Sequence, residues 1–274
     1  MPVAPLPNGV RLYYEEYGDA AMPAVVLIPP AGADHRAWIF QTAEFAAHYR
    51  TIVFDNRAVG ETEYPSATFG VADMAEDVCQ LLDHLDVERT ALVGAALGGC
   101  VAMELALTHP ERVWALVLAS TTCGGKLASR SHAERLAIVE AITALPPAER
   151  ARQLARLYYG PRAWDTAPDA YGAIATRAGW DSDERIDLDR HPHNRAIASF
   201  DVSKRIGRLR GPTLVIHGDD DMLVPPADGG RLADAIRGAR FHVVHGGHLC
   251  FMQSAGEFNR ATLDFLAAVL QDAR

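Results

Sequence analysis

Short runs of apolar, largely β-branched residues alternate along this chain with segments of helical periodicity. The runs are AVVLI (24–28), TIVF (51–54), TALVG (90–94), WALVLAS (114–120) and PTLVIHG (212–218). Continuous apolarity is typical of strands that are covered on both faces, as in a parallel sheet. Between two of the runs, residues 69–87 place their apolar side chains on one helical stripe. The alternation predicts an α/β fold with a mostly parallel sheet flanked by helices.

The alternation stops between Cys123 and Phe200, where no strand-like run occurs. This segment has helical patterns first and loop-rich sequence after them. We interpret residues 123–205 as a helical cap inserted into a core of residues 1–122 and 206–274. A second independent domain is the alternative, although the segment is short and polar for a core of its own.

Composition narrows the possible partners. The chain has 26 Lys and Arg against 35 Asp and Glu, a net charge of −9, which argues against nucleic-acid and anionic-membrane partners. Four scattered cysteines without a CxxC pair predict neither a metal site nor disulfides. No secretory signal and no membrane-spanning run is visible. We therefore expect a cytoplasmic protein that uses no metal or cofactor. The oligomeric state cannot be read from the sequence, and we take a monomer or homodimer as the expectation.

The junction VGAALGG (93–99) joins a predicted strand to a predicted helix. Residues 94–98 match the nucleophile-elbow pattern G-x-S-x-G at every position except the central one, which is Ala96. Small flanking residues allow neighbouring backbones to approach in such a turn. An ordinary tight strand-to-helix turn is the alternative interpretation.

Two further stretches follow predicted strands and carry an acid and a histidine. In HGDDDMLVPP (217–226) we choose Asp221 as the acid, whereas Asp219 and Asp220 can equally be turn or capping residues. In HVVHGGHLCF (242–251) we choose His248, because two glycines precede it, and keep His245 as a competing candidate. The order of elbow, acid and histidine is the order found in α/β-hydrolases.

With these stretches the chain resembles the α/β-hydrolases, in particular the branch of enol-lactonases and polyketide methylesterases. The matching stretches are FDNRAVGETEYP (54–65), residues 93–122, residues 212–226 and GGHLCFMQSAGEFN (246–259). The resemblance implies an eight-stranded sheet with a helical cap and a Ser-His-Asp triad for ester hydrolysis.

Carried over by position, the resemblance makes His248 the base, Asp221 the residue that orients it, and Ala96 the occupant of the nucleophile position. The oxyanion hole would be formed by the backbone N–H groups of Leu97 and Ala31. The loop PPAGADHRAW (29–38) departs from the usual pattern, and Pro30 has no N–H to donate.

The missing hydroxyl at position 96 closes the acyl-enzyme route, and removal of such a serine costs about 10⁶ in kcat. We expect an inactive Ser-to-Ala variant of a serine-type hydrolase of carboxylic esters or lactones. The alternative is a relative that naturally lacks the serine and uses His248 and Asp221 for proton transfer, as a lyase, isomerase or cyclase, or that only binds a ligand.

The predicted cap supplies side chains for a substrate pocket. The candidates are Tyr158, Tyr159, Trp164, Trp180 and, after the histidine, Met252. Such residues either line an apolar pocket or pack the cap on the sheet. A substrate carboxylate could meet one of four arginines, which are Arg152, Arg156, Arg162 and Arg177. We expect a medium-sized, largely apolar ester or lactone as the substrate.

Overall fold

The computed structural model describes residues 2–65, 68–178, 181 and 191–272. In this part of the chain one eight-stranded sheet has the order β1-β2-β4-β3-β5-β6-β7-β8. The strands are β1 (Val3–Pro5), β2 (Arg11–Tyr17), β3 (Ala24–Ile28), β4 (Arg50–Phe54), β5 (Thr90–Ala95), β6 (Val113–Ala119), β7 (Thr213–Gly218) and β8 (Arg240–Val244). Strand β2 pairs antiparallel with β1 and β4, and every other pairing is parallel. The predicted mostly parallel sheet is confirmed.

The central strands separate two apolar cores, one on each face of the sheet. Along β3, Val25 and Leu27 belong to one core, whereas Val26 and Ile28 belong to the other. All five residues of this strand are buried, because both faces of the sheet are covered by helices. This double coverage explains why the strand sequences are continuously apolar.

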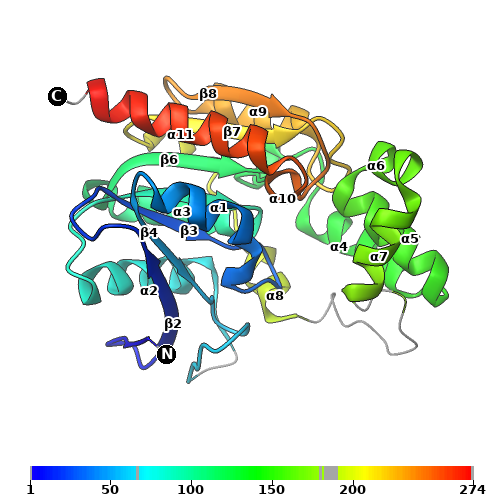
Figure 1. Ribbon diagram of the computed structural model, residues 1–274, viewed down its shortest axis with the longest axis horizontal. Helices are drawn as coiled ribbons and strands as arrows, with labels where there is room; N and C mark the ends of the chain where they lie inside the picture. Colours follow the sequence, from blue (N-terminus) through cyan, green and yellow to red (C-terminus); the bar gives the residue numbers. More distant parts are fainter. Residues whose placement is uncertain (1, 66–67, 179–180, 182–190, 273–274) are drawn as a thin grey trace.

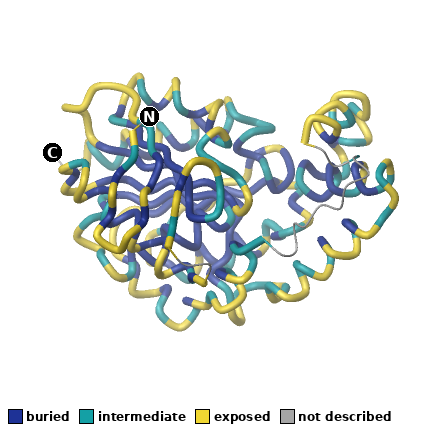
Figure 2. The backbone as a smooth tube through the Cα atoms, turned by 90° about the horizontal axis from the view of Figure 1, so that it is seen from below, coloured by how far each residue is buried: buried dark blue, intermediate teal, exposed yellow. Residues whose placement is uncertain are grey.

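Five helices cover the two faces (Figure 1). Apolar residues of α1 (Ile39–Ala46) and α11 (Ala255–Asp272) pack in one core, and those of α2 (Val71–His84), α3 (Leu97–Thr108) and α9 (Pro226–Ala235) pack in the other. Figure 2 shows the buried strands at the centre, with exposed backbone on the outer side of the helices. None of the helices in the described residues is long and apolar enough to cross a lipid bilayer.

A group of helices stands beyond the carboxyl ends of the parallel strands, on the right of Figure 1. They are α4 (His132–Thr143), α5 (Pro147–Tyr159), α6 (Pro161–Thr166) and α7 (Pro168–Arg177). The chain returns to the sheet through α8 (Pro192–Ala198), and α10 (Cys250–Gln253) follows β8. The described residues of the 123–205 segment contain no strand, as the sequence predicts. This segment therefore faces the edge of the sheet where ligands bind in α/β proteins.

Candidate active site

The turn between β5 and α3 holds Ala96 in a left-handed backbone conformation, with φ +49° and ψ −112°. The glycines on either side have no room for a side chain: a Cβ on Gly94 would lie 2.2 Å from the carbonyl oxygen of Gly98, and one on Gly98 would lie 2.1 Å from that of Ile28. The Thr121 hydroxyl donates to the Ala96 carbonyl at 2.7 Å. The glycines and this hydrogen bond fix the sharp turn that the G-x-x-x-G spacing predicts.

His248 and Asp221 form a buried pair at the ends of β8 and β7. The Nδ1 atom of His248 lies 2.9 Å from Oδ2 of Asp221, and both side chains are buried. The other oxygen of Asp221 accepts the backbone N–H groups of Leu223 and Val224, each at 2.9 Å. These bonds hold the carboxylate in place, and an Nδ1–H bonded to it leaves Nε2 of His248 as the acceptor.

A cavity of about 300 Å³ brings the elbow and the histidine together. Ala96 and His248 both line it, as do Leu97 and Ala31, whose backbone N–H groups the sequence assigns to an oxyanion hole. Leu97 is the first residue of α3, where backbone N–H groups lack partners within the helix. The cavity thus brings together a candidate base, His248, and candidate donors for a developing negative charge.

The aromatic and Met candidates differ in position. Tyr158 and Met252 line the cavity, and the ring centroids of Tyr158 and His248 are 6.3 Å apart. Tyr159 packs on Tyr171, with centroids 5.1 Å apart, and neither it nor Trp164 belongs to the described lining. Trp180 lies outside the described residues.

The loop that carries Ala31 is held by a histidine that no motif of the sequence marks. The buried ring of His193, on α8, accepts the Gly32 N–H at Nδ1 (3.0 Å), and Nε2 lies 2.5 Å from the Arg57 carbonyl oxygen. Burial lowers the pKa of His193 to about 4, so that the ring is neutral near pH 7. This ring spans 161 positions of sequence to reach Gly32, a distance that no local pattern reveals.

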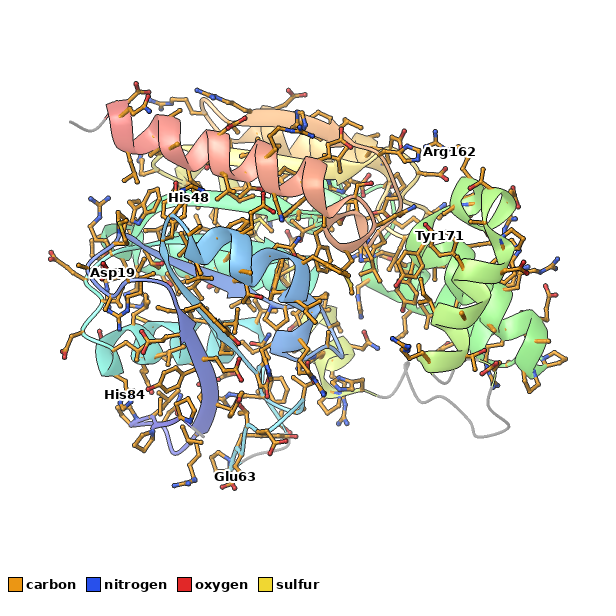
Figure 3. The ribbon with its side chains drawn as sticks, viewed as in Figure 1. Asp19, His48, Glu63, His84, Arg162 and Tyr171 are labelled. Carbon is orange, nitrogen blue, oxygen red and sulfur yellow. The ribbon has the colours of Figure 1, made fainter. Side chains whose placement is uncertain are left out.

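The helical segment is attached directly to the loop of His248. The Leu249 N–H donates to the Tyr158 carbonyl at 2.9 Å, and a Cβ on Gly247 would lie 2.4 Å from the backbone of Tyr159. At the same edge, the Gln253 amide donates to the hydroxyl of Tyr171 at 3.2 Å. Figure 3 shows Tyr171 on the side of the segment that faces the sheet. Helix α5 therefore buttresses the loop that carries His248.

The competing acids and histidine have other contacts. Asp219 and Asp220 form ion pairs with Arg162, at 2.6 and 3.3 Å, and Figure 3 shows Arg162 at the top of the same edge. His245 is 64% exposed and lies 3.7 Å from Asp219. Cys100 lines the cavity, but burial raises the pKa of its thiol to about 11, so that it is not a thiolate nucleophile near pH 7.

The four arginines considered for a substrate carboxylate do not line the described cavity. Arg152 pairs with Glu149 and Arg156 with Asp165, each on the surface of the helical segment. Arg162 pairs with Asp219 and Asp220, and Arg177 is exposed. The cavity instead receives Arg135 from α4, which the sequence analysis missed. Its signal was the spacing of His132, Arg135, Leu136 and Val139, which lie on one helical face and all line the cavity.

One group of side chains has the composition of a metal site. Ligand atoms of Asp34, His35 and Asp55 lie within 4.8 Å of one another. Asp55 already accepts the backbone N–H of His35 (2.8 Å), lies 2.7 Å from its Nδ1, and accepts the Glu61 N–H (2.8 Å). These bonds account for the arrangement as a brace between the end of β4 and the following loops.

The model of the alpha/beta hydrolase fold family matches residues 23–255. The chain belongs to this family, and the eight-stranded sheet and the elbow between β5 and α3 agree with that assignment.

Two relatives of similar sequence are named hydrolases. The chain is 36% identical over 268 residues to the "Putative carbamate hydrolase RutD" of Variovorax paradoxus, covering 94% of this chain and 97% of that protein. It is 33% identical over 259 residues to the protein of the same name from Klebsiella pneumoniae strain 342, covering 92% and 94%.

Solved structures show the same fold. A hydrolase from Pseudomonas aeruginosa PA01 superposes with a TM-score of 0.80 at 28% identity, covering 97% of both chains. The enol-lactonase from Burkholderia xenovorans LB400 superposes with a TM-score of 0.81 at 25% identity, covering 97% of this chain and all of the other.

Proposed function

We propose that the cavity beside Ala96 is the site of a hydrolase of small esters, lactones or carbamates, with residues 123–205 as a cap over the core of residues 1–122 and 206–274. The observation that carries the proposal is the buried His248–Asp221 pair, whose histidine lines the same cavity as the strained turn at position 96. Carbamates join esters and lactones as substrates because the relatives at 33–36% identity carry that activity in their name.

In this mechanism His248 acts as the general base. Its Nδ1–H bonds to Asp221, which fixes the tautomer and stabilises the imidazolium that forms. The Nε2 atom takes a proton from a water molecule while the water oxygen attacks the substrate carbonyl carbon. The backbone N–H groups of Leu97 and Ala31 stabilise the resulting oxyanion. As the intermediate collapses, His248 returns its proton to the leaving group.

Ala96 determines which nucleophile is available. With a methyl group there, direct attack by water is the route open to this chain. With serine at position 96, the hydroxyl would attack first and form an acyl-enzyme that water then hydrolyses. The second route is the one expected of a serine-type hydrolase, of which the present chain would be the inactive form.

The test compares four proteins: the chain itself, Ala96→Ser, His248→Ala and His245→Ala. Each is assayed with p-nitrophenyl butyrate, a panel of small lactones and an aryl carbamate. His245 is the matched control, because it is an exposed histidine in the same loop. On the water route, His248→Ala loses turnover and His245→Ala keeps it. On the serine route, the same difference is expected when the two substitutions are made in Ala96→Ser.

The outcomes separate the routes. Turnover by the unmodified chain that depends on His248 identifies direct attack by water. Turnover that appears only in Ala96→Ser, with a burst of the first product, identifies the serine route and the inactive-variant interpretation. If neither form hydrolyses any compound, the hydrolase proposal is wrong, and proton transfer by a lyase, isomerase or cyclase, or ligand binding alone, takes its place.

A further inference from the structure

Arg135 brings a positive charge into the cavity. It lies on α4, and its Nη1 donates to the backbone carbonyl of Arg130 at 2.6 Å. Among the described residues no carboxylate lies within ion-pair distance of its guanidinium. Desolvation by burial lowers the pKa of Arg135, whereas a buried carboxylate partner, Asp77, raises the pKa of Arg57. Arg135 is therefore a partly buried cation without a counter-ion in the described structure.

The described lining of the cavity offers no acid to neutralise this charge. No Asp or Glu belongs to its described lining, and apart from the histidines Arg135 is the one ionisable cation there. The acids whose charge influences Arg135, Asp228 and Asp221, are engaged elsewhere, with Arg231 and with His248. A desolvated guanidinium without a partner is costly, and a ligand carboxylate that forms paired hydrogen bonds with it removes that cost.

A second polar atom lies on the same helical face. His132 lines the cavity one turn before Arg135, and its buried Nε2 has no hydrogen-bond partner among the described residues. Burial, and then the charge of Arg135, lower the pKa of His132. An anion bound at Arg135 would have the opposite effect, because a nearby negative charge favours the imidazolium. The two side chains together form a polar patch in an otherwise largely apolar wall.

We propose that Arg135 binds a carboxylate of the substrate, so that the substrate is an acid-bearing ester, lactone or carbamate whose anionic end lies at α4. This inference rests on the proposed function and names the substrate class for it. The cavity of about 300 Å³ is at the small end of ligand sites, so that a compact monoanion fits better than a long acyl chain. Arg135 acts as a specificity-determining residue, at a distance from the reacting carbonyl.

The test measures binding by calorimetry, so that it does not depend on turnover. The probes are the monomethyl esters of succinate, glutarate and adipate and the corresponding dimethyl esters, which have the same chain but no charge. The proteins are the unmodified chain, Arg135→Gln, Arg135→Lys and the control Arg152→Gln, whose arginine pairs with Glu149 on the surface of α5.

We expect at least one monoanion to bind more tightly than its dimethyl ester. Arg135→Gln should weaken the binding of the monoanion by about 10- to 100-fold, the range of a charge-assisted hydrogen-bonding pair. The same substitution should leave the affinity for the dimethyl ester unchanged. Arg135→Lys should restore part of the affinity, and Arg152→Gln should change nothing.

Equal binding of charged and neutral esters, equal loss of both in Arg135→Gln, or no binding of any monoanion at millimolar concentration would overturn the assignment. Selective binding of monoanions without hydrolysis by any form would instead refute the proposed function and leave the anion site intact.

Discussion

The buried ring of His193 makes the stability of the fold depend on pH in a defined window. The ring accepts the N–H of Gly32 and contacts the carbonyl of Arg57. Burial, and then the neighbouring charge of His191, lower its pKa from 6.5 to about 4. The unfolded chain therefore binds a proton more readily than the native protein between these values. Stability should fall as the pH falls from 6.5 towards 4 and level off below that.

The size of the effect follows from the two pKa values. With 6.5 for the unfolded chain and about 4 for the native protein, the proton linkage of His193 removes about 2 kcal/mol from the free energy of unfolding between pH 7 and pH 4.5. Protonation also removes the acceptor of the Gly32 N–H, so that the loop carrying Ala31 loosens in the same window. His217, whose pKa burial likewise lowers to about 4, adds its own slope.

The assay is urea-induced unfolding at pH 7, 5.5 and 4.5, applied to the unmodified chain, His193→Phe and His242→Gln. His193→Phe should be less stable at pH 7, by about 1–3 kcal/mol for each backbone group left unpaired. The further loss of its free energy of unfolding between pH 7 and pH 4.5 should be about 2 kcal/mol smaller than that of the unmodified chain. His242→Gln alters an exposed side chain and should keep the original slope. A His193→Phe slope equal to that of the unmodified chain would refute the reasoning.

Three further outcomes test other parts of the structure. Gly98→Ala places a Cβ 2.1 Å from a strand carbonyl oxygen and should cost more than about 2 kcal/mol in thermal unfolding, whereas Gly172→Ala, with nothing within 4 Å, should be neutral or stabilising by up to about 1 kcal/mol. Asp77→Ala leaves buried Arg57 without its ion-pair partner and should destabilise by about 3–5 kcal/mol; a loss below 1 kcal/mol would contradict it. In whichever form hydrolyses, Asp221→Asn should lower kcat by about 10⁴ without changing the circular dichroism spectrum.

The central sheet could be predicted because burial on both faces leaves a direct trace in the sequence. Strands β3 to β7 are short continuous apolar runs, and those runs were recognised. The first two strands were missed for a physical reason. β2 reads RLYYEEY, with its last residues exposed, and β1 is three residues long, so that neither shows the continuous apolarity of a covered strand.

The pairing of His248 with Asp221 could be predicted because each residue follows a strand of the parallel sheet, and the carboxyl ends of such strands meet at one edge. Arg135 was missed because the choice among arginines used only their place in the helical segment. Arg152 already shows its partner in the sequence, Glu149 three residues earlier, which marks it as a surface pair. Arg135 has no such partner in the described structure, and a cation without one on an apolar helical face is the more informative signal.

The backbone conformation at Ala96 allows a test of whether the turn at position 96 stores strain. Its φ of +49° costs an alanine about 1–3 kcal/mol, yet the turn is imposed by the Thr121 hydrogen bond and the close approach of Gly94 to Gly98. Ala96→Gly should therefore be neutral or stabilising by about 1 kcal/mol. Ala137→Gly, at an exposed position within α4, should lose about 1 kcal/mol. Equal losses in the two variants would show that no strain is stored at the turn. A gain of stability in Ala96→Gly beside a loss in Ala137→Gly would show that residue 96 is held against its own backbone preference. Such strain is expected where the direction in which a side chain points into a cavity matters more than stability.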